Sequence, residues 1–366
     1  MSQRCPPHHL HHLFCCPQYM NNVEKTTPFH SPSPRANDYA GRVGEADGRA
    51  RMEMMEGNFL GLADVDGPCD VAILQIPYEL TTSYGEGTVD GPQACIAAST
   101  QVELYDPLLP EDLPAGFRLH TAPAWDGEGD SLAEQLANVE TYLSDYLDGS
   151  CFPVVLGGEH GLLPVEMRAL RAHPDIEGDL SRVTLVQIDA HADLRDEMNG
   201  ERASHACAAR RALDEGVGGI IQIGVRAISR EEALFLAEDG RVECFPARDL
   251  LSTCSGERDW NLLQARLADI DGPVWLTLDI DGLDGGLVPN TGTPVPGGLH
   301  YWQAVELIEA LFANPDCRVL GADVVEIVPG KEGPLTEFTA AMLATKVIAA
   351  HLANLLEQRE KQEVET

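Results

Sequence analysis

Two apolar runs in this sequence end in ionisable residues at alternate positions. Asp189, His191 and Asp193 follow the first run, separated by single alanines, and Asp279 and Asp281 follow the second. In an extended chain, side chains at alternate positions point the same way, so we expect each group to converge along a ladder that continues its strand. The spacing therefore predicts clusters of carboxylate and imidazole groups.

His160, after a third apolar run, brings the set to four carboxylates and two imidazoles. Crowded carboxylates repel one another, and a shared divalent cation relieves the repulsion. Mixed oxygen and imidazole ligands suit Mn, Fe, Zn or Ni, and carboxylate-rich sites favour manganese. Six ligands are enough for two ions, and a pair about 3.5–4 Å apart can activate a water molecule. Each motif alone also arises by chance or as a helix cap, but three in one chain favour metal.

The elements that must position these residues are strands alternating with helices. The predicted strands are residues 70–77, 153–158, 182–189, 218–224, 273–281 and 317–327, with a seventh candidate near His120. The predicted helices are residues 131–147, 230–240, 260–270, 301–313 and 335–356. The strands are almost continuously apolar, which indicates burial on both faces. This alternation predicts an α/β fold in which helices cover a parallel sheet.

Sites in such sheets form beyond the carboxyl ends of the strands. His160, Asp189, Asp279 and Glu326 all stand at or just past the ends of predicted strands. Four strands are therefore expected to deliver ionisable groups to one edge. The alternative for Glu326 is a glutamate on the surface at a strand end.

Composition limits the class of partner. The chain has 366 residues, with 59 Asp and Glu against 25 Lys and Arg, a formal charge of −34. This charge argues against nucleic-acid binding and suits cationic ligands, although solubility or adaptation to salt explains it better than steering does. Ten cysteines without a CxxC pair favour the cytoplasm, with reduced thiols. The sequence contains no apolar run long enough to predict a membrane span.

Residues 1–55 are rich in His, Cys and Pro and lack periodicity, so we expect a disordered N-terminal tail, followed by a catalytic domain over residues 56–366. Adventitious metal binding by His8, His9, His11 and His12 is an alternative role for the tail. A transit peptide and an over-long gene start also stay open. The other histidines without a partner motif, His120, His173, His300 and His351, are interpreted as surface or turn residues.

Several motifs occur in an order that resembles the ureohydrolase superfamily of arginases and agmatinases. They are GGEH (157–160), DAHAD (189–193), SHACAARR (204–211), DIDGLD (279–284), TGTPVPGGL (291–299) and DVVEIVP (323–329). Residues 76–106 are similar to the agmatinase branch in particular. The resemblance implies a three-layer α/β/α sandwich with a central, mainly parallel sheet. It also implies a pair of manganese ions, bridged by Asp189 and Asp279, with these ligands: His160, Asp189, His191, Asp193, Asp279 and Asp281.

The resemblance further implies hydrolysis of a guanidino C–N bond, releasing urea and a primary amine from a small cationic substrate. Glu326 would hold the guanidinium group by charge-assisted hydrogen bonds. Asp193 would orient the nucleophile, and His205, with an ordinary pKa of about 6.5, would carry a proton to the leaving amine. A structural loop histidine is the alternative for His205. Relatives form trimers or hexamers, so a homo-oligomer is expected.

Agmatine is the leading substrate, because SYGEGTVDGPQA (83–94) is similar to agmatinases. Arg195 stands where arginases usually have Asn, and Gly285 and Asn290 replace residues frequent in relatives, so substrate identity stays open among arginine, guanidinobutyrate and guanidine, the last with nickel. Two other classes also stay open: a deacetylase-like hydrolase with a single zinc ion, and a scaffold without catalysis. Metal content separates these classes.

Overall fold

The structure is a computed structural model that describes residues 57–63, 67–127 and 129–365. These residues belong to one compact unit, Met52–Thr366. The predicted disordered tail, residues 1–55, and its histidines lie outside the described residues. Its disorder and its metal binding stay predictions.

One parallel sheet of eight strands forms the centre of the described chain, in the order β2-β1-β3-β8-β7-β4-β5-β6. Every neighbouring pair is parallel. The strands are β1 (Val71–Ile76), β2 (Leu119–Thr121), β3 (Phe152–Gly157), β4 (Thr184–Ile188), β5 (Gly219–Ile223), β6 (Val242–Phe245), β7 (Gly272–Asp279) and β8 (Cys317–Val325). The predicted parallel sheet is confirmed, and the short strands β2 and β6 form its two edges.

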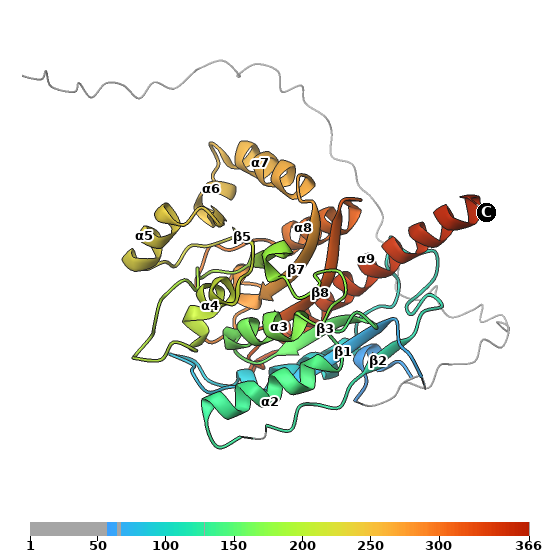
Figure 1. Ribbon diagram of the computed structural model, residues 1–366, viewed down its shortest axis with the longest axis horizontal. Helices are drawn as coiled ribbons and strands as arrows, with labels where there is room; N and C mark the ends of the chain where they lie inside the picture. Colours follow the sequence, from blue (N-terminus) through green and yellow to red (C-terminus); the bar gives the residue numbers. More distant parts are fainter. Residues whose placement is uncertain (1–56, 64–66, 128, 366) are drawn as a thin grey trace, which may run out of the picture. The chain divides into compact units, whose positions relative to one another are not determined.

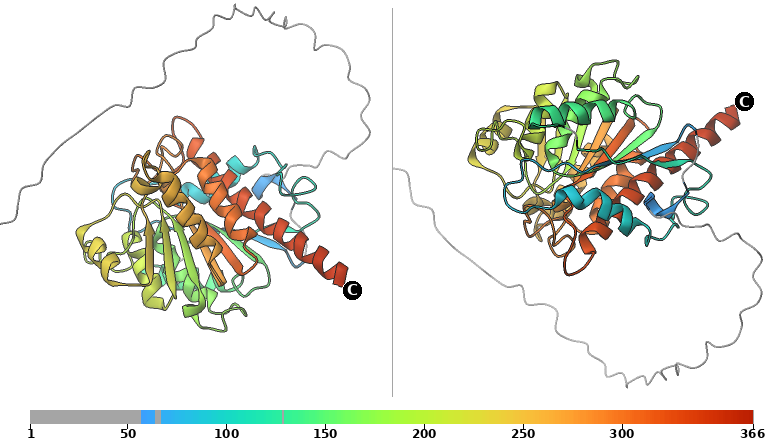
Figure 2. Two further views of the ribbon diagram at one scale, coloured as in Figure 1. Left: turned by 90° about the horizontal axis from the view of Figure 1, so that it is seen from above. Right: turned by 90° about the horizontal axis from the view of Figure 1, so that it is seen from below.

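Helices cover both faces of the sheet (Figure 1), and each face has its own hydrophobic core. Helices α7, α8 and α9 lie on one face, and α2, α3 and α4 lie on the other (Figure 2). The three-layer α/β/α sandwich is therefore confirmed. The helices are α1 (Gly91–Ser99), α2 (Leu132–Ser144), α3 (Leu163–Leu170), α4 (Ala208–Glu215), α5 (Arg230–Glu238), α6 (Ala247–Leu250), α7 (Gly256–Ala268), α8 (Tyr301–Ala313) and α9 (Leu335–Glu365).

All seven predicted strands are present, but the sequence patterns missed β6 and four helices. Strand β6 is a short edge strand in which only Val242 is buried, so it shows no buried apolar run. Helix α3 is buried over nearly its whole length and therefore lacks the polar face that marks a surface helix. Helices α1, α4 and α6 are short, and the first two carry the motif residues around Gly91 and Ala208.

Helix α9 has the length and composition of a membrane-spanning helix over Leu335–Lys361, a feature that the sequence patterns had not predicted. However, 67% of its most apolar stretch is buried inside the domain. Val347 and Ile348 belong to the same hydrophobic core as the strands β7 and β8. Core packing accounts for the apolar character of this helix.

Candidate metal centre

The strands that carry the candidate residues are neighbours in the sheet. Their order is β3-β8-β7-β4, and each ends at the same edge because all pairings are parallel. His160 follows β3 in a short 3-10 turn, Glu326 follows β8, Asp279 is the last residue of β7, and Asp189 follows β4. Four adjacent strands therefore deliver ionisable groups to one place.

The turn after β3 needs glycine because it passes close to another backbone segment. A Cβ at Gly158 would lie 1.8 Å from the carbonyl oxygen of Tyr78. The N–H of Glu159 donates to that same oxygen at 2.9 Å, and the N–H of Glu326 donates to the oxygen of Gly158 at 2.8 Å. These bonds fix the chain direction immediately before His160.

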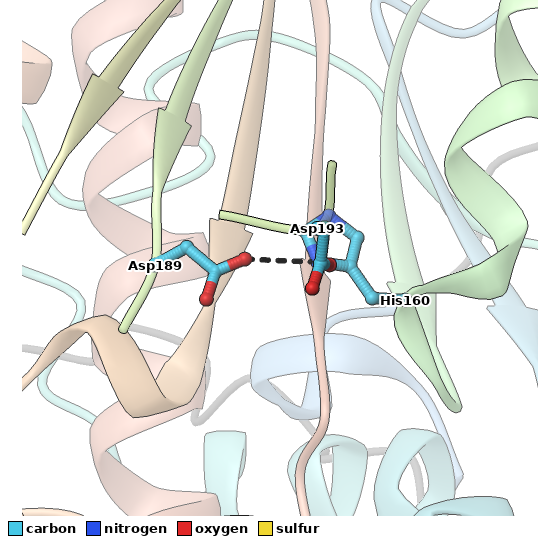
Figure 3. Close-up of side chains that lie close together, drawn as sticks. All are labelled: His160, Asp189 and Asp193. Atoms are coloured by element: carbon cyan, nitrogen blue, oxygen red, sulfur yellow. Dashed lines mark ion pairs between the residues drawn. The ribbon is translucent and has the colours of Figure 1, made fainter. Parts of the chain in front are cut away.

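The first group of ligand atoms surrounds His160. Its Nδ1 lies 3.1 Å from Oδ2 of Asp189 and 3.0 Å from Oδ2 of Asp193. Oδ2 of Asp279 is 3.6 Å away. Figure 3 shows His160, Asp189 and Asp193 pointing toward one another. All are at least nine-tenths buried.

The second group shares Asp189 with the first. His191 Nδ1 lies 3.7 Å from Oδ1 of Asp189 and 3.0 Å from Oδ2 of Asp281. Asp189 thus presents one oxygen to each group. The two triads, His160–Asp189–Asp193 and Asp189–His191–Asp281, each have ligand atoms within 4.8 Å of one another and so could hold a metal ion.

Unpartnered polar atoms point to a cation at both positions. Nδ1 of His160 and Oδ2 of Asp281 are buried and have no hydrogen-bond partner among the described residues. Buried polar atoms normally have partners, because leaving them unpaired costs free energy. The donor set of carboxylate oxygens and imidazole nitrogens fits manganese, and these two atoms are open to it.

The reason for the convergence differs from the prediction. We expected extended ladders, but β4 ends at Ile188 and Asp193 has a left-handed backbone with φ of 51°. Asp281 lies in the 3-10 turn Ile280–Gly282, where its N–H donates to Oδ1 of Asp279 at 2.9 Å. The extended geometry on which the ladder prediction depends therefore does not persist to Asp193 and Asp281. The turns after the strands orient these two side chains.

A hydrogen-bonded chain behind His160 sets its tautomer. Asp323 accepts hydrogen bonds from the Thr277 hydroxyl and from the Trp275 indole, both at 2.8 Å. Because the Thr277 hydroxyl donates to Asp323, its oxygen accepts the Nε2–H of His160, which is 2.9 Å away. This leaves the lone pair of Nδ1 directed at the carboxylates, as a metal-binding histidine requires.

Other polar residues that we did not predict support the remaining ligands. Gln187 donates to Oδ2 of Asp189 at 2.7 Å and accepts from Gln222 at 2.8 Å, both within the buried sheet. Arg226 donates from one nitrogen to the carbonyl oxygens of Asp281 and Val295, each at 2.6 Å. Its guanidinium therefore ties the turn after β7 to the loop at the pocket mouth.

Glu326 is 4% exposed, so the alternative of a surface glutamate is wrong. Its backbone is left-handed, with φ of 62°, a conformation that costs free energy in a residue other than glycine. Oε1 accepts the N–H of His160 at 2.8 Å and lies 3.4 Å from Nδ1 of His205. The backbone of His205 is also held in place, because its N–H donates to the Thr81 hydroxyl at 2.9 Å.

The ionisation of the site reflects crowded negative charge. Burial raises the pKa of Asp193 to about 6, and the charge of Asp189 adds to the effect. Burial also raises the pKa of Asp279 well above its ordinary value, with help from Asp281 and Asp189. Burial disfavours protonated His160, but its carboxylate neighbours still raise its pKa well above the ordinary value. Protons held in this way are those that a bound cation displaces.

A cavity of about 530 Å³ opens over the site. His191, Asp193, Asp279, Glu326 and His205 line it on the metal side. Its remaining wall includes Ser83, Arg195, Arg226, Ile228, Ser229 and Thr293. The cavity therefore offers room for a small molecule beside both triads.

Arg195, Gly285 and Asn290, the positions that left the substrate open, lie in different places. Arg195 lines the cavity, with its Nε 3.9 Å from Oε2 of Glu232. Asn290 lies outside it, where its N–H donates to Thr336 at 3.0 Å, and Gly285 has open space around its Cα. Of the three, only Arg195 can contact a substrate in the cavity.

The interpretation of the leftover histidines as surface or turn residues is confirmed for two of them. The carbonyl oxygen of His173 accepts the Ile176 N–H at 3.2 Å in a turn, and His300 stands at the exposed start of α8. The interpretation is wrong for His120, which lies within β2, and for His351, which stacks on Phe152 with ring centroids 3.9 Å apart.

Comparison with known proteins identifies a family whose matched region includes the residues of the candidate site. The model of the arginase family matches residues 69–350, which contain both triads, Glu326 and His205. The chain belongs to the arginase family. Its members act on guanidino substrates, and the chain is accordingly a hydrolase of this class, as its sequence motifs predicted.

Relatives with similar sequences are agmatinase-like. An N(1)-aminopropylagmatine ureohydrolase of Synechocystis sp. is 34% identical over 286 residues, which cover 76% of this chain and 88% of the relative. An agmatinase of Pyrococcus horikoshii is 32% identical over 284 residues, covering 76% and 91%. Among solved structures, the agmatine ureohydrolase of Thermoplasma volcanium has a TM-score of 0.67 and 27% identity, covering 84% of this chain and 96% of that one.

Proposed function

We propose that this arginase-family protein is a binuclear manganese enzyme that hydrolyses agmatine to putrescine and urea. The observation that carries the proposal is the pair of triads that share Asp189, set beneath a cavity of about 530 Å³. The acidic pocket floor suits a cationic guanidinium group, and the agmatinase-like relatives narrow the substrate.

The six carboxylate and imidazole residues would hold the two ions. Asp189 would bridge them, because it already presents one oxygen to each histidine. Asp279, 3.6 Å from His160, would be the second bridge. When bound, the ions supply Lewis acidity that makes a water molecule nucleophilic at neutral pH.

Glu326 would position the guanidinium group. Its Oε1 is engaged by the His160 N–H, so Oε2 is the oxygen available for a charge-assisted hydrogen bond with the substrate. A Cβ at Gly292 would come within 3.2 Å of that Oε2, so glycine leaves the space beside it open. Asp193 lies within the first triad and on the cavity wall, where it would orient the attacking water.

His205 would donate a proton to the leaving amine. Burial disfavours its charged form, but the hydrogen bond to Glu326 outweighs burial and raises its pKa to about 8. Below that pH the imidazole is mostly protonated, which is the form that a departing amine needs. Its Nε2 has no hydrogen-bond partner among the described residues and is the atom free to donate.

A second substrate, N(1)-aminopropylagmatine, is favoured by the relatives that bear this name. Those of Synechocystis sp. and Thermus thermophilus are 34% and 35% identical to this chain. The added aminopropyl group is a flexible cation, and the cavity of about 530 Å³ would have to receive it. The two substrates share the same chemistry at the guanidinium carbon.

Urea release tests the proposal. The purified protein, loaded with manganese, is assayed with agmatine, N(1)-aminopropylagmatine, arginine, guanidinobutyrate and guanidine, the last also with nickel. We expect the highest kcat/KM with agmatine. A preference for arginine or guanidinobutyrate would replace agmatine while leaving the hydrolysis of a guanidino bond in place. Absence of urea from every substrate would contradict the proposal.

Metal analysis distinguishes the other classes. About two manganese ions per chain support this proposal, whereas one zinc ion would support a deacetylase-like hydrolase and none a scaffold. The proposal also includes a cytoplasmic location and a trimer or hexamer. Light scattering of the purified protein measures its oligomeric state independently of activity.

A further inference from the structure

Two thiols meet at the edge of the sheet opposite the metal centre. Cys69 lies two residues before β1, and Cys151 immediately precedes β3. These strands pair in parallel, with Val71 opposite Phe152, and the Phe152 N–H donates to the oxygen of Asp70 at 3.0 Å. Two cysteines that are distant in sequence are therefore held at neighbouring strand starts.

The two side chains also lie on the same face of the sheet. Cys69 and Cys151 both pack against the hydrophobic core under α2, beside Tyr146. The thiol of Cys151 donates to the oxygen of Tyr146 at 3.8 Å, and burial, with help from the neighbouring Cys69, raises the pKa of the Cys151 thiol. Both cysteines are reduced and partly exposed. They line a cleft of about 320 Å³, so a small oxidant can reach them.

We propose that Cys69 and Cys151 form a disulfide under oxidising conditions and so clip β1 to β3. Neighbouring strands lie about 4.8 Å apart, and a disulfide needs Cα atoms about 4.4–6.8 Å apart. Residues at adjacent strand starts, packed against the same core and lining the same cleft, meet this requirement without a change in the strand pairing. The clip closes the long connection that contains β2 and α2.

The oxidant can be a small disulfide such as oxidised glutathione. The thiolate of Cys69 attacks one glutathione sulfur, forming a mixed disulfide and releasing one glutathione thiolate. Cys151 then loses its proton to water, and its sulfur attacks that of Cys69, releasing the second glutathione. Two protein thiols are oxidised, and one glutathione disulfide is reduced to two thiols. Cys151 acts second, because burial and the neighbouring Cys69 raise its pKa to about 12.

The clip would act on stability and leave activity unchanged. It ties β1 and β2 to the centre of the sheet at their amino ends, whereas the metal centre lies at the carboxyl ends. Closing a long loop stabilises a protein by restricting its unfolded chain. The inference is therefore independent of the proposed substrate and of metal content.

Peptide mapping of the full-length protein tests the clip. Protein treated with oxidised glutathione is digested without reduction and analysed by mass spectrometry, in parallel with untreated protein. We expect one linked peptide pair joining Cys69 to Cys151, with the loss of two hydrogens, and a Tm higher by about 5 °C that returns to its starting value with dithiothreitol.

Three variants make the result specific. Cys69→Ser and Cys151→Ser should each lose both the link and the rise in Tm, whereas Cys254→Ser, at an exposed cysteine outside the cleft, should keep both. The inference fails if wild-type protein carries no such link while Cys254 becomes glutathionylated. It also fails if Cys69 and Cys151 each retain a separate glutathione.

Discussion

The two edges of the sheet carry similar residues in opposite electrostatic settings. At the amino edge, Asp175 pairs with Arg318 at 2.8 Å, and Asp70 accepts the backbone N–H of Arg118 at 2.7 Å. At the carboxyl edge, no Lys or Arg among the described residues forms an ion pair with any of the four aspartates. The nearby Arg226 instead donates hydrogen bonds to backbone carbonyl oxygens.

This difference teaches what separates a structural cluster from a metal site. Aspartate and histidine occur at both edges, so residue type alone does not distinguish a metal site from a structural cluster. What decides is whether the protein supplies its own cations. The amino edge is compensated by arginine, whereas the carboxyl edge concentrates buried carboxylates around His160 without an ion pair to Lys or Arg among the described residues. A charge deficit of this kind, under a cavity, indicates an exogenous cation.

The sharpest way to break the comparison is to remove one aspartate from each edge. Asp279→Ala removes a candidate bridging ligand, so we expect urea release to fall by about a thousandfold or more, because metal assistance supplies most of the rate enhancement. Asp175→Ala, the matched control, should leave kcat within about twofold, because among the described residues that carboxylate forms ion pairs only with Arg318 and His173. Equal losses from the two variants would refute the distinction.

The support behind His160 predicts a smaller effect. Thr277→Val keeps the shape of the side chain but removes the hydroxyl that accepts Nε2–H, so the tautomer of His160 is no longer fixed. We expect manganese affinity to weaken by about 10–100-fold, as for other partners of metal-binding histidines. Titration of metal-free protein with manganese measures this affinity without reference to turnover.

Thr345→Val is the control for that variant. It also removes a hydroxyl, but one that donates within α9 at 2.7 Å, away from the metal centre. Its manganese affinity should match that of the wild type. If Thr277→Val also bound manganese normally, the hydrogen-bonded chain through Asp323 would have no role in presenting Nδ1.

The sequence predicted the ends of the strands better than the geometry of the turns. Buried apolar runs followed by Asp or His are visible in a linear pattern, so His160, Asp189, Asp279 and Glu326 could be assigned to one edge. The left-handed backbones of Asp193 and Glu326 depend on tertiary contacts, which alternation in sequence does not record.

The supporting residues were missed, although a signal for them existed. Gln187, Thr277 and Asp323 are buried polar residues inside strands whose other buried positions are mostly apolar. A buried polar side chain requires a partner, so each one predicts a second polar group nearby. The partner's identity depends on strand order, and the order β3-β8-β7-β4 is not readable from a single chain of residues.

The histidines sharpen the comparison through pH. At the amino edge, burial lowers the pKa of His351 to about 4, so the folded protein holds this imidazole neutral beside Phe152. The unfolded chain binds a proton below about pH 6.5, but the folded chain does so only near pH 4. Neutral His351 therefore makes its full contribution to the free energy of unfolding above about pH 6.5. This contribution falls as the pH drops, by about 2 kcal/mol between pH 7 and pH 4.5.

A variant isolates this contribution from the other groups that titrate. His351→Phe retains a ring on Phe152 but removes the proton site. Urea denaturation of both proteins at several pH values gives their free energies of unfolding. The wild type should lose about 2 kcal/mol more than His351→Phe between pH 7 and pH 4.5. Parallel curves for the two proteins would show that His351 is protonated equally in the folded and unfolded states.

The weakest expected effect concerns the cation that compensates the amino edge. Arg318 is about half exposed, and its Nε lies 2.8 Å from Asp175. Because water screens such a pair, Arg318→Ala should reduce the free energy of unfolding by less than about 1 kcal/mol. Urea release should be unchanged, since Asp175 stays solvated. If this variant instead acquired affinity for manganese at the amino edge, measured by titration beyond two ions per chain, the removal of one cation would suffice to convert a compensated cluster into a metal site.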